Sequence, residues 1–149
     1  MIRKARPSDV KGIQRLINFY AEKGLMLPRS LNELYENLRD FWVYTEKRKI
    51  LGCCALHLSW KDLAEIKSLV VEESFQNKGI GSALIEVSLK EAKEFAVKEV
   101  FVLSYSPDYF KKFGFKKISK ERLPHRIWQE CIRCSKFPDC KEIALIKQL

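Results

Sequence analysis

Hydrophobic residues at the start of the chain are spaced first as in a strand and then as in a helix. Residues 1–5, MIRKA, have the composition of a short strand. Residues 7–9, Pro-Ser-Asp, then supply a typical helix start. Apolar residues follow at helical spacing, namely Val10, Ile13, Leu16, Ile17 and Tyr20. The pattern predicts a first helix that ends near Gly24.

A second helix and a strand pair are predicted next. In residues 27–41, LPRSLNELYENLRDF, Ser30 and Glu33 form a capping box ahead of apolar residues at helical spacing. Residues 41–46 and 50–58 are rich in aromatic, β-branched and other apolar residues, and a charged turn separates them. They are therefore expected to pair as adjacent strands.

The second half of the chain alternates between strands and helices. Residues 63–71 predict a third strand, and residues 79–95 have an apolar face at helical spacing that predicts a long helix. EVFVLS at 99–104 is almost wholly apolar and predicts a central strand. The remaining predicted elements are a short helix at 107–113 closed by Gly114, a strand at 115–118 and a last strand within 142–149, with an irregular segment at about 119–142.

This order of elements predicts a single domain of the α/β (α+β) class over residues 1–149. The expected architecture is a mixed central sheet of about six to seven strands with helices on both faces. A chain of 149 residues is long enough to bury a sizeable core.

Composition and charge narrow the possible partners. Hydrophobic residues make up 46% and charged residues 32%, and no apolar run is long enough to span a bilayer, so no membrane partner is expected. The formal charge is +9, but the lysines are interleaved with acidic residues, which is more typical of a solvated surface than of a nucleic-acid site. The N-terminus lacks a secretory h-region and the five cysteines are expected to be reduced, so a cytoplasmic location is predicted.

Two glycines stand where a strand gives way to the long helix. Residues 76–82 read Gln-Asn-Lys-Gly-Ile-Gly-Ser. A helix N-terminus has unpaired N–H groups and a partial positive charge, so it binds phosphate when no side chain blocks the approach. Gly79 and Gly81 would remove that block. The third glycine of a dinucleotide fingerprint is absent, and so is the Gly-Lys-Ser/Thr sequence of a P-loop. An ordinary glycine-containing turn is the alternative.

The wider context resembles the GNAT family of acetyl-CoA-dependent N-acetyltransferases. The resemblance rests on SLVV at 68–71, the Gln-x-x-Gly-x-Gly turn, the long helix, the next strand and YFKKFGF at 109–115. It implies that acetyl-CoA is the cosubstrate and that the strand at 65–71 splays from its neighbour at 100–104. The implied contacts to the cofactor lie at Leu69, Val70, Val71, Gln76, Asn77, Lys78, Gly79, Ile80, Gly81 and Ser82.

Glu65 is the candidate for the group that deprotonates the amine. An amine must lose a proton before it attacks a thioester, and a carboxylate within reach is the expected acceptor. Strand alternation predicts that Glu65, Lys67 and Leu69 share one face, which would point Glu65 into the cleft. A solvated carboxylate at a strand end is the alternative.

A closer resemblance concerns the amine. LPRSLNELYENLRDF, GCCALH, AEIKSLVV and ECIRCSKF together are similar to the acetyltransferase domain of N-acetylglutamate synthases, which act first in arginine biosynthesis. The resemblance implies that Arg29 and Arg133, with Ser135 beside it, hold the carboxylates of L-glutamate. It also implies that the backbone around Ser68 and Leu103 holds the α-carboxylate. Arginine suits this role because its fork of donors matches a carboxylate.

The general acid is less defined by the sequence. Many family members have a tyrosine four residues before the Gly-Phe pair, where this chain has Phe110. Ser104 or a water is expected to protonate the leaving thiolate, and neither Tyr105 nor Tyr109 is assigned. A thiol pKa of about 8.5 makes the thiolate a good leaving group without much help.

The cysteines and histidines are the residues that could support other chemistry. Cys131, Cys134 and Cys140, with His125 upstream, have some of the spacing of a zinc site, but a second C-x2-C pair is lacking and no metal is predicted. Cys53 and Cys54 are consecutive in a strand, so they are expected on opposite faces. His57, on the same apolar strand, is expected to be a hydrogen-bonded core histidine rather than a base.

Two other functions stay open. One is a GNAT enzyme that acetylates another amino acid, a polyamine or a protein N-terminus. The other is a CoA-binding or basic regulatory module without catalysis. A homodimer is compatible with either.

Overall fold

A seven-stranded mixed sheet forms the centre of the computed structural model, which describes residues 1–123 and 142–149. The strand order is β1-β2-β3-β4-β5-β7-β6, and β4 and β5 are the parallel neighbours in an otherwise antiparallel sheet. The strands are β1 (Ile2–Lys4), β2 (Phe41–Glu46), β3 (Lys49–Trp60), β4 (Leu63–Val71), β5 (Glu99–Ser104), β6 (Lys116–Ile118) and β7 (Ile143–Gln148). The predicted fold class is confirmed.

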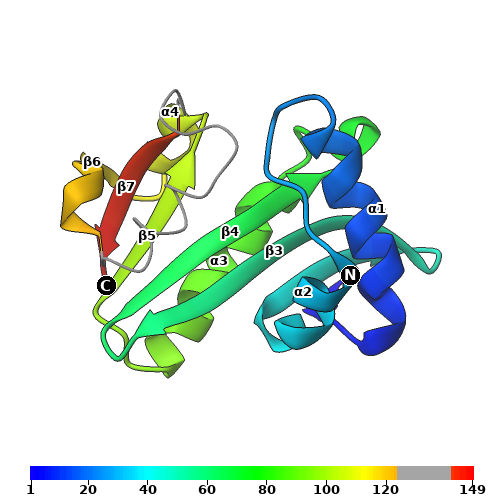
Figure 1. The fold of residues 1–149 in the computed structure, drawn as a ribbon, viewed down its shortest axis with the longest axis horizontal. Coiled ribbons are helices and arrows are strands. Elements are labelled where there is room, and N and C mark those ends of the chain that lie inside the picture. Colours follow the sequence, from blue (N-terminus) through cyan, green and yellow to red (C-terminus); the bar gives the residue numbers. More distant parts are fainter. Residues whose placement is uncertain (124–141) are drawn as a thin grey trace.

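Helices cover both faces of the sheet, as expected. α1 (Val10–Ala21) and α2 (Leu31–Glu36) lie on one face, and α3 (Ile80–Glu94) packs on the other (Figure 1). α4 (Pro107–Lys111) follows β5, and short 3-10 turns lie at η1 (Pro7–Asp9), η2 (Leu38–Asp40), η3 (Glu73–Phe75) and η4 (Lys120–Arg122).

Local sequence signals explain where these elements begin. The Ser30 hydroxyl accepts a hydrogen bond from the Glu33 N–H at 3.1 Å, and the Glu33 side chain accepts one from the Ser30 N–H at 3.4 Å. The predicted capping box therefore starts α2. Lys47 and Arg48 both have positive φ, at 49° and 65°, between the paired residues Glu46 and Lys49. This two-residue turn matches the twist of the β2–β3 hairpin.

The core is divided by the sheet into two layers. Between the sheet and α3 lie buried residues that include Leu56, Ile66 and Leu84, and between the sheet and α1 lie Ile13, Val43 and Ala55 among others. Cys54 belongs to the first layer and Cys53 to the second, which confirms that the two thiols face opposite sides. Both layers converge on β3 and β4, the strands that carry the site.

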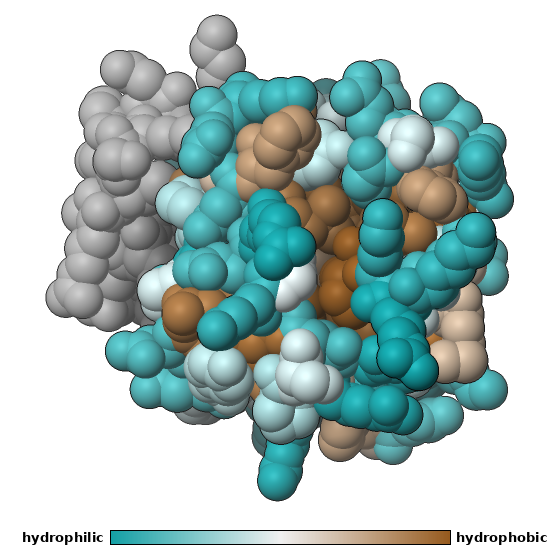
Figure 2. All heavy atoms as spheres, turned by 90° about the vertical axis from the view of Figure 1, so that its right-hand side faces the viewer, coloured by the Kyte–Doolittle hydropathy of each residue, from teal (hydrophilic) through white to brown (hydrophobic). Residues whose placement is uncertain are grey.

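The surface next to α1 is largely hydrophilic. Figure 2 shows the side of the molecule that lies on the right in Figure 1, where hydrophobic side chains appear in a central band between hydrophilic ones. No helix within residues 1–123 or 142–149 has the length and apolar character needed to cross a membrane.

Candidate active site

The strands β4 and β5 part after three residues. Their pairing covers Leu63–Glu65 of β4 against Glu99–Phe101 of β5, and the register contains no further partners. Beyond it, β5 bonds on its other side to β7, while β4 continues along β3 as far as Val71. Figure 1 shows the two strands diverging from their shared end. One edge of β4 is thus left without a strand partner over residues 66–71 among the described residues.

A bulge at Ser68 interrupts β4 within this stretch. Ser68 has a φ of 56°, and three residue steps from Lys67 to Val70 oppose two steps from Ala55 to Cys53. The extra residue reverses the alternation of the strand. Leu69 therefore packs in the α3 layer, whereas Val70 packs in the α1 layer. The prediction that Glu65, Lys67 and Leu69 share a face is wrong for Leu69.

The turn that follows β4 opens the N-terminus of α3 to solvent. Asn77 and Gly79 have φ values of 63° and 83°, and Gly79 is the N-cap of the helix. A side chain at Gly79 would contact nothing within 4 Å, so the space above it is open. The Gln76 side chain donates to the Val71 carbonyl at 2.9 Å and ties the turn to β4. The first N–H groups of α3 have no partner inside the helix and attract anions.

Gly81 is needed for a different reason. A Cβ atom at this position would stand 2.6 Å from the hydroxyl oxygen of Tyr109 in α4. The Tyr109 ring is held by edge contacts to Phe110 and Phe113, with centroids 5.6 Å away in both cases. Its hydroxyl therefore lies over the first turn of α3. The sequence assigns no role to Tyr109, because this contact joins elements far apart in the chain.

Hydrogen bonds to α1 fix the backbone of Arg29. The side-chain amide of Asn18 accepts from the Arg29 N–H at 3.0 Å and donates to the Arg29 carbonyl at 3.4 Å. Gln14 donates to the same carbonyl at 3.3 Å. The segment between α1 and α2 is thus pinned to the face of the sheet that α1 covers.

The Arg29 side chain reaches the bulge of β4. Its Nε lies 3.5 Å from the Ser68 hydroxyl, and its guanidinium lies 3.7 Å from the Glu33 carboxylate, one turn along α2. The guanidinium side chain is 23% exposed, so it remains accessible to a small molecule. Two residues expected to contact the same substrate are therefore neighbours.

Glu65 lies on the same face of the sheet as these groups. It is 8% exposed and is the direct cross-strand partner of His57 on β3. Directly opposed residues of an antiparallel pair point to the same side, with Cβ atoms about 5 Å apart. His57 bonds through Nδ1 to the Asp40 carboxylate at 2.6 Å, which confirms the predicted hydrogen bond. Its side chain is 28% exposed, so the prediction that it is a core residue is wrong. Glu65 is buried, so the alternative of a solvated strand-end carboxylate is wrong.

The β5 residues occupy the other side of the opening. Leu103 packs against Phe101 and Leu123. The Ser104 hydroxyl accepts a hydrogen bond from the Ser106 N–H at 2.9 Å, where the chain turns towards α4. Phe110 is buried in the α3 layer, so the position that carries a tyrosine in many GNAT enzymes is here part of the core.

Several candidates fall in residues 124–141, which lie outside the described residues. They are Arg133 and Ser135 of the expected substrate site, and His125, Cys131, Cys134 and Cys140, whose spacing partly matches that of a zinc site. Within the described part of the chain, no three histidine, cysteine or carboxylate residues gather as metal ligands. Burial raises the pKa of the Cys54 thiol to about 12 and also raises that of Cys53. Both thiols stay protonated at neutral pH and are not nucleophiles.

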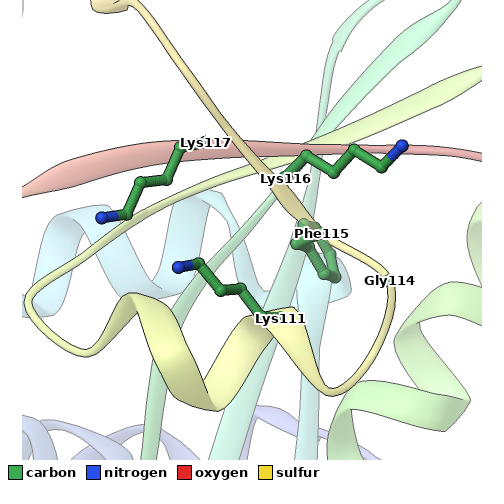
Figure 3. A pocket seen from close by; sticks show the side chains of 5 residues that line it. All are labelled: Lys111, Gly114, Phe115, Lys116 and Lys117. Atoms are coloured by element: carbon green, nitrogen blue, oxygen red, sulfur yellow. The ribbon is translucent and has the colours of Figure 1, made fainter.

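A separate hollow of about 490 Å³ lies beside α4 and β6. Lys111, Lys116, Lys117, Gly114 and Phe115 line it. In Figure 3 the side chains of Lys111 and Lys117 extend to one side and that of Lys116 extends to the other. The three ammonium groups do not converge on one point, so the hollow is not assigned a ligand.

The splayed sheet, the open helix N-terminus and the buried carboxylate define an acyl-transfer enzyme of the GNAT class. Residues 37–117 match the family model described as an acetyltransferase (GNAT) domain. The chain belongs to this family. It is an acetyl-CoA-dependent N-acetyltransferase, and acetyl-CoA is its cosubstrate.

Its relatives include amino-acid acetyltransferases. An uncharacterized N-acetyltransferase of Chlorobaculum tepidum is 44% identical over 148 residues, which are 99% of this chain and 96% of the relative. An amino-acid acetyltransferase of Mycobacterium tuberculosis is 35% identical over 136 residues, 89% of this chain and 78% of that protein. Amino-acid acetyltransferases of Pseudomonas and Vibrio species are matched over less than a third of their length.

Solved structures agree with this grouping. A Mycobacterium tuberculosis protein in complex with CoA has a TM-score of 0.83 at 30% identity and is covered over 99% of its chain. N-acetylglutamate synthase from Neisseria gonorrhoeae, complexed with coenzyme A and N-acetyl-glutamate, has a TM-score of 0.91 at 26% identity. Both alignments include 100% of this chain, which spans 35% of the gonococcal chain.

Proposed function

We propose that this protein is an N-acetylglutamate synthase, which transfers the acetyl group of acetyl-CoA to the α-amine of L-glutamate in the first step of arginine biosynthesis. The observation that carries the proposal is the Nε of Arg29 at 3.5 Å from the Ser68 hydroxyl, on the face of β4 that bears Glu65. A carboxylate anchor then lies on the same face of the sheet as the group that would deprotonate the amine. The amino-acid acetyltransferases among the relatives support the same substrate class.

Coenzyme A fits the residues at the splay. The edge of β4 that has no strand partner within residues 1–123 and 142–149 offers backbone groups to the pantetheine arm at Leu69, Val70 and Val71. The pyrophosphate would lie on the turn and first helical residues, namely Gln76, Asn77, Lys78, Gly79, Ile80, Gly81 and Ser82. The open space at Gly79 and the free N–H groups of α3 supply room and positive potential for it.

The chain's own groups divide the chemistry between them. Glu65 accepts a proton from the ammonium group of the substrate, which frees the lone pair for attack. Backbone N–H groups near Leu69 stabilise negative charge on the thioester oxygen, an interaction that is typically worth a few kcal/mol. Ser104 or a water returns a proton to the leaving sulfur.

Charged and backbone groups would orient glutamate. Arg29 and Arg133 bind its carboxylates, with Ser135, and the backbone at Ser68 and Leu103 holds the α-carboxylate. A dicarboxylate requires at least two such anchors to fix its amine relative to the thioester. A polyamine would instead be repelled by the Arg29 guanidinium.

Release of CoA from acetyl-CoA, measured with a panel of amines, tests the proposal. The panel contains glutamate, glutamine, aspartate, ornithine, spermidine and a blank without amine, at two salt concentrations. A clear preference for glutamate is expected. Preference for another amine would be consistent with an N-acetyltransferase but would reject glutamate as the substrate. Binding of CoA without any turnover would favour the regulatory module.

Variants of the two arginines then test the binding mode. Arg29→Ala and Arg133→Ala are each expected to raise the KM for glutamate far more than the KM for acetyl-CoA. Arg122→Ala, at an exposed arginine of η4, is the matched control and should change neither constant. If the substitutions raised the KM for acetyl-CoA as much as the KM for glutamate, the arginines would not be assigned to the glutamate site.

A further inference from the structure

The Asp40–His57 pair lies one strand away from the proposed base, because His57 is the register partner of Glu65. β2 begins one residue after Asp40, and β3 carries His57 opposite Glu65 of β4. Leu56 and Ile66, the next pair in the register, point into the α3 layer, so His57 and Glu65 project to the opposite face. The register of three segments therefore aligns two carboxylates with an imidazole between them in strand order.

The bond to Asp40 fixes the chemistry of the imidazole. An ionised carboxylate can only accept hydrogen bonds, so the Nδ1 atom of His57 at 2.6 Å from Asp40 Oδ2 carries the proton. The neutral ring then has its lone pair on Nε2, which makes that atom a proton acceptor. When Nε2 takes up a proton, the Asp40 carboxylate stabilises the resulting imidazolium.

A proton taken up by Glu65 must leave the site before the next turnover. Glu65 is 8% exposed, whereas the His57 side chain is 28% exposed and that of Asp40 is 22% exposed. Asp40 and His57 are thus more exposed to solvent than Glu65 is. η2 and β4, the two elements that carry the hydrogen-bond partner and the register partner of His57, contain the charged residues Arg39, Asp40, Glu65 and Lys67.

We infer that Asp40 and His57 form a relay that returns Glu65 to its ionised state, and this inference rests on the role proposed for Glu65. One proton moves from the ammonium group to the Glu65 carboxylate, from the resulting carboxyl group by way of a water molecule to Nε2 of His57, and from the imidazolium to solvent. No electrons are transferred and the net change is one proton released to solvent. His57 and Asp40 are positioning and relay residues, since they act through Glu65.

A double-mutant cycle tests this dependence on Glu65. His57→Gln and Asp40→Asn should each lower kcat by about tenfold or more, which is the lower range for lost acid–base assistance, and leave both KM values unchanged. In the Glu65→Gln background, His57→Gln should cause no further loss. Additive losses, a change confined to KM, or an unchanged kcat would overturn the relay.

Two controls keep this cycle interpretable. Glu91→Gln weakens an ion pair of similar burial with Lys4, at 3.1 Å on the other face of the sheet, and should leave kcat unchanged. Arg29→Ala should still lower the rate of the Glu65→Gln variant. This would show that the Glu65→Gln rate lies above the uncatalysed rate, so that a further loss can be measured. If Glu91→Gln lowers kcat as much as His57→Gln does, loss of stability explains both and the relay is rejected.

A measurement without substrate separates this inference from the proposed function. The chain has two histidines, His57 and His125, so a His125→Gln variant assigns the imidazole signals in a 15N NMR spectrum. At mildly alkaline pH the His57 ring should show the Nδ1–H tautomer and should lose that preference in Asp40→Asn. Glu65→Gln should shift the ring signals, and Glu91→Gln should not. If the 15N signals of the His57 ring do not change in Glu65→Gln, the relay is overturned, even if glutamate proves to be the substrate.

Discussion

The hydroxyl oxygen of Tyr109 stands 2.6 Å from the position that a Cβ atom on Gly81 would occupy. The absence of a side chain at Gly81 in α3 therefore leaves room for the Tyr109 side chain of α4, at the opening of the proposed cofactor site. Gly79, two residues earlier, is constrained instead by its φ of 83°, with open space around it. The two glycines of the turn serve different physical needs.

Gly81→Ala is expected to destabilise the protein by about 1–2 kcal/mol, as overpacking does. Tyr109→Phe removes the atom that clashes, so Gly81→Ala in that background should be neutral or gain up to about 1 kcal/mol from helix propensity. Urea unfolding of the four proteins measures this cycle. Gly79→Ala is the control, because its strain comes from the backbone and Tyr109→Phe should not relieve it. Equal costs of Gly81→Ala in both backgrounds would contradict the packing argument.

Asn18 should influence glutamate binding without touching it. Its side chain forms two hydrogen bonds with the Arg29 backbone, at 3.0 and 3.4 Å. Asn18→Ala is expected to raise the KM for glutamate about tenfold, which corresponds to about 1.4 kcal/mol of lost positioning. The KM for acetyl-CoA should not change. Steady-state kinetics with each substrate varied in turn provide the measurement.

Gln14→Ala serves as the comparison for Asn18→Ala. Gln14 makes one hydrogen bond of 3.3 Å to the same carbonyl, so a smaller rise in the KM for glutamate is expected. If Asn18→Ala raised both KM values equally, a general loss of structure would be the better explanation.

Structural features that depend on residues near each other in the sequence can be predicted from it. The capping box of Ser30 and Glu33 and the helical spacing after Asp9 depend on local geometry, and the structure confirms both. The splay of β4 from β5 followed from the family resemblance rather than from periodicity, and the register confirms it.

Contacts across the sheet could not be predicted in the same way. A bulge at Ser68 places a non-glycine residue at positive φ, which no local pattern indicated, and it moved Leu69 to the other face. The pairing of His57 with Glu65 depends on strand register, and the approach of Tyr109 to Gly81 depends on how α4 docks. These relationships arise from tertiary packing, in which one register step changes every neighbour.

Glu33 competes with the proposed substrate for Arg29. Its carboxylate lies 3.7 Å from the guanidinium and is 54% exposed, so the ion pair is weak and easily displaced. Glu33→Gln keeps an oxygen for the capping box and removes the charge. The KM for glutamate should fall about twofold to threefold, which corresponds to ~0.5 kcal/mol for a helical ion pair. Glu36→Gln removes another exposed carboxylate of α2 and should have no such effect. An unchanged or higher KM in Glu33→Gln would show that the ion pair does not compete with glutamate.

Asp9 should make the stability of the fold depend on pH in the acid range. Its carboxylate accepts hydrogen bonds from Arg3 at 2.7 and 3.0 Å and from the Arg6 N–H at 2.7 Å. The bonds to Arg3, the largest cause, lower the pKa of Asp9 below its ordinary value of 3.8. A group whose pKa is lowered by folding contributes stability above its unfolded pKa and loses it as the pH falls through the folded value.

Asp9→Asn is therefore expected to cost about 2 kcal/mol at neutral pH, in the range for hydrogen bonds to charged groups. The difference from the unmodified protein should narrow once the pH falls below 3.8 and disappear below the lowered pKa. Urea unfolding at a series of pH values measures it. Asp108→Asn is the control, because the Asp108 side chain is 93% exposed and its ion pair with Lys111 contributes little. A difference that stays constant down to the acid end would show that Asp9 acts through packing rather than through its charge.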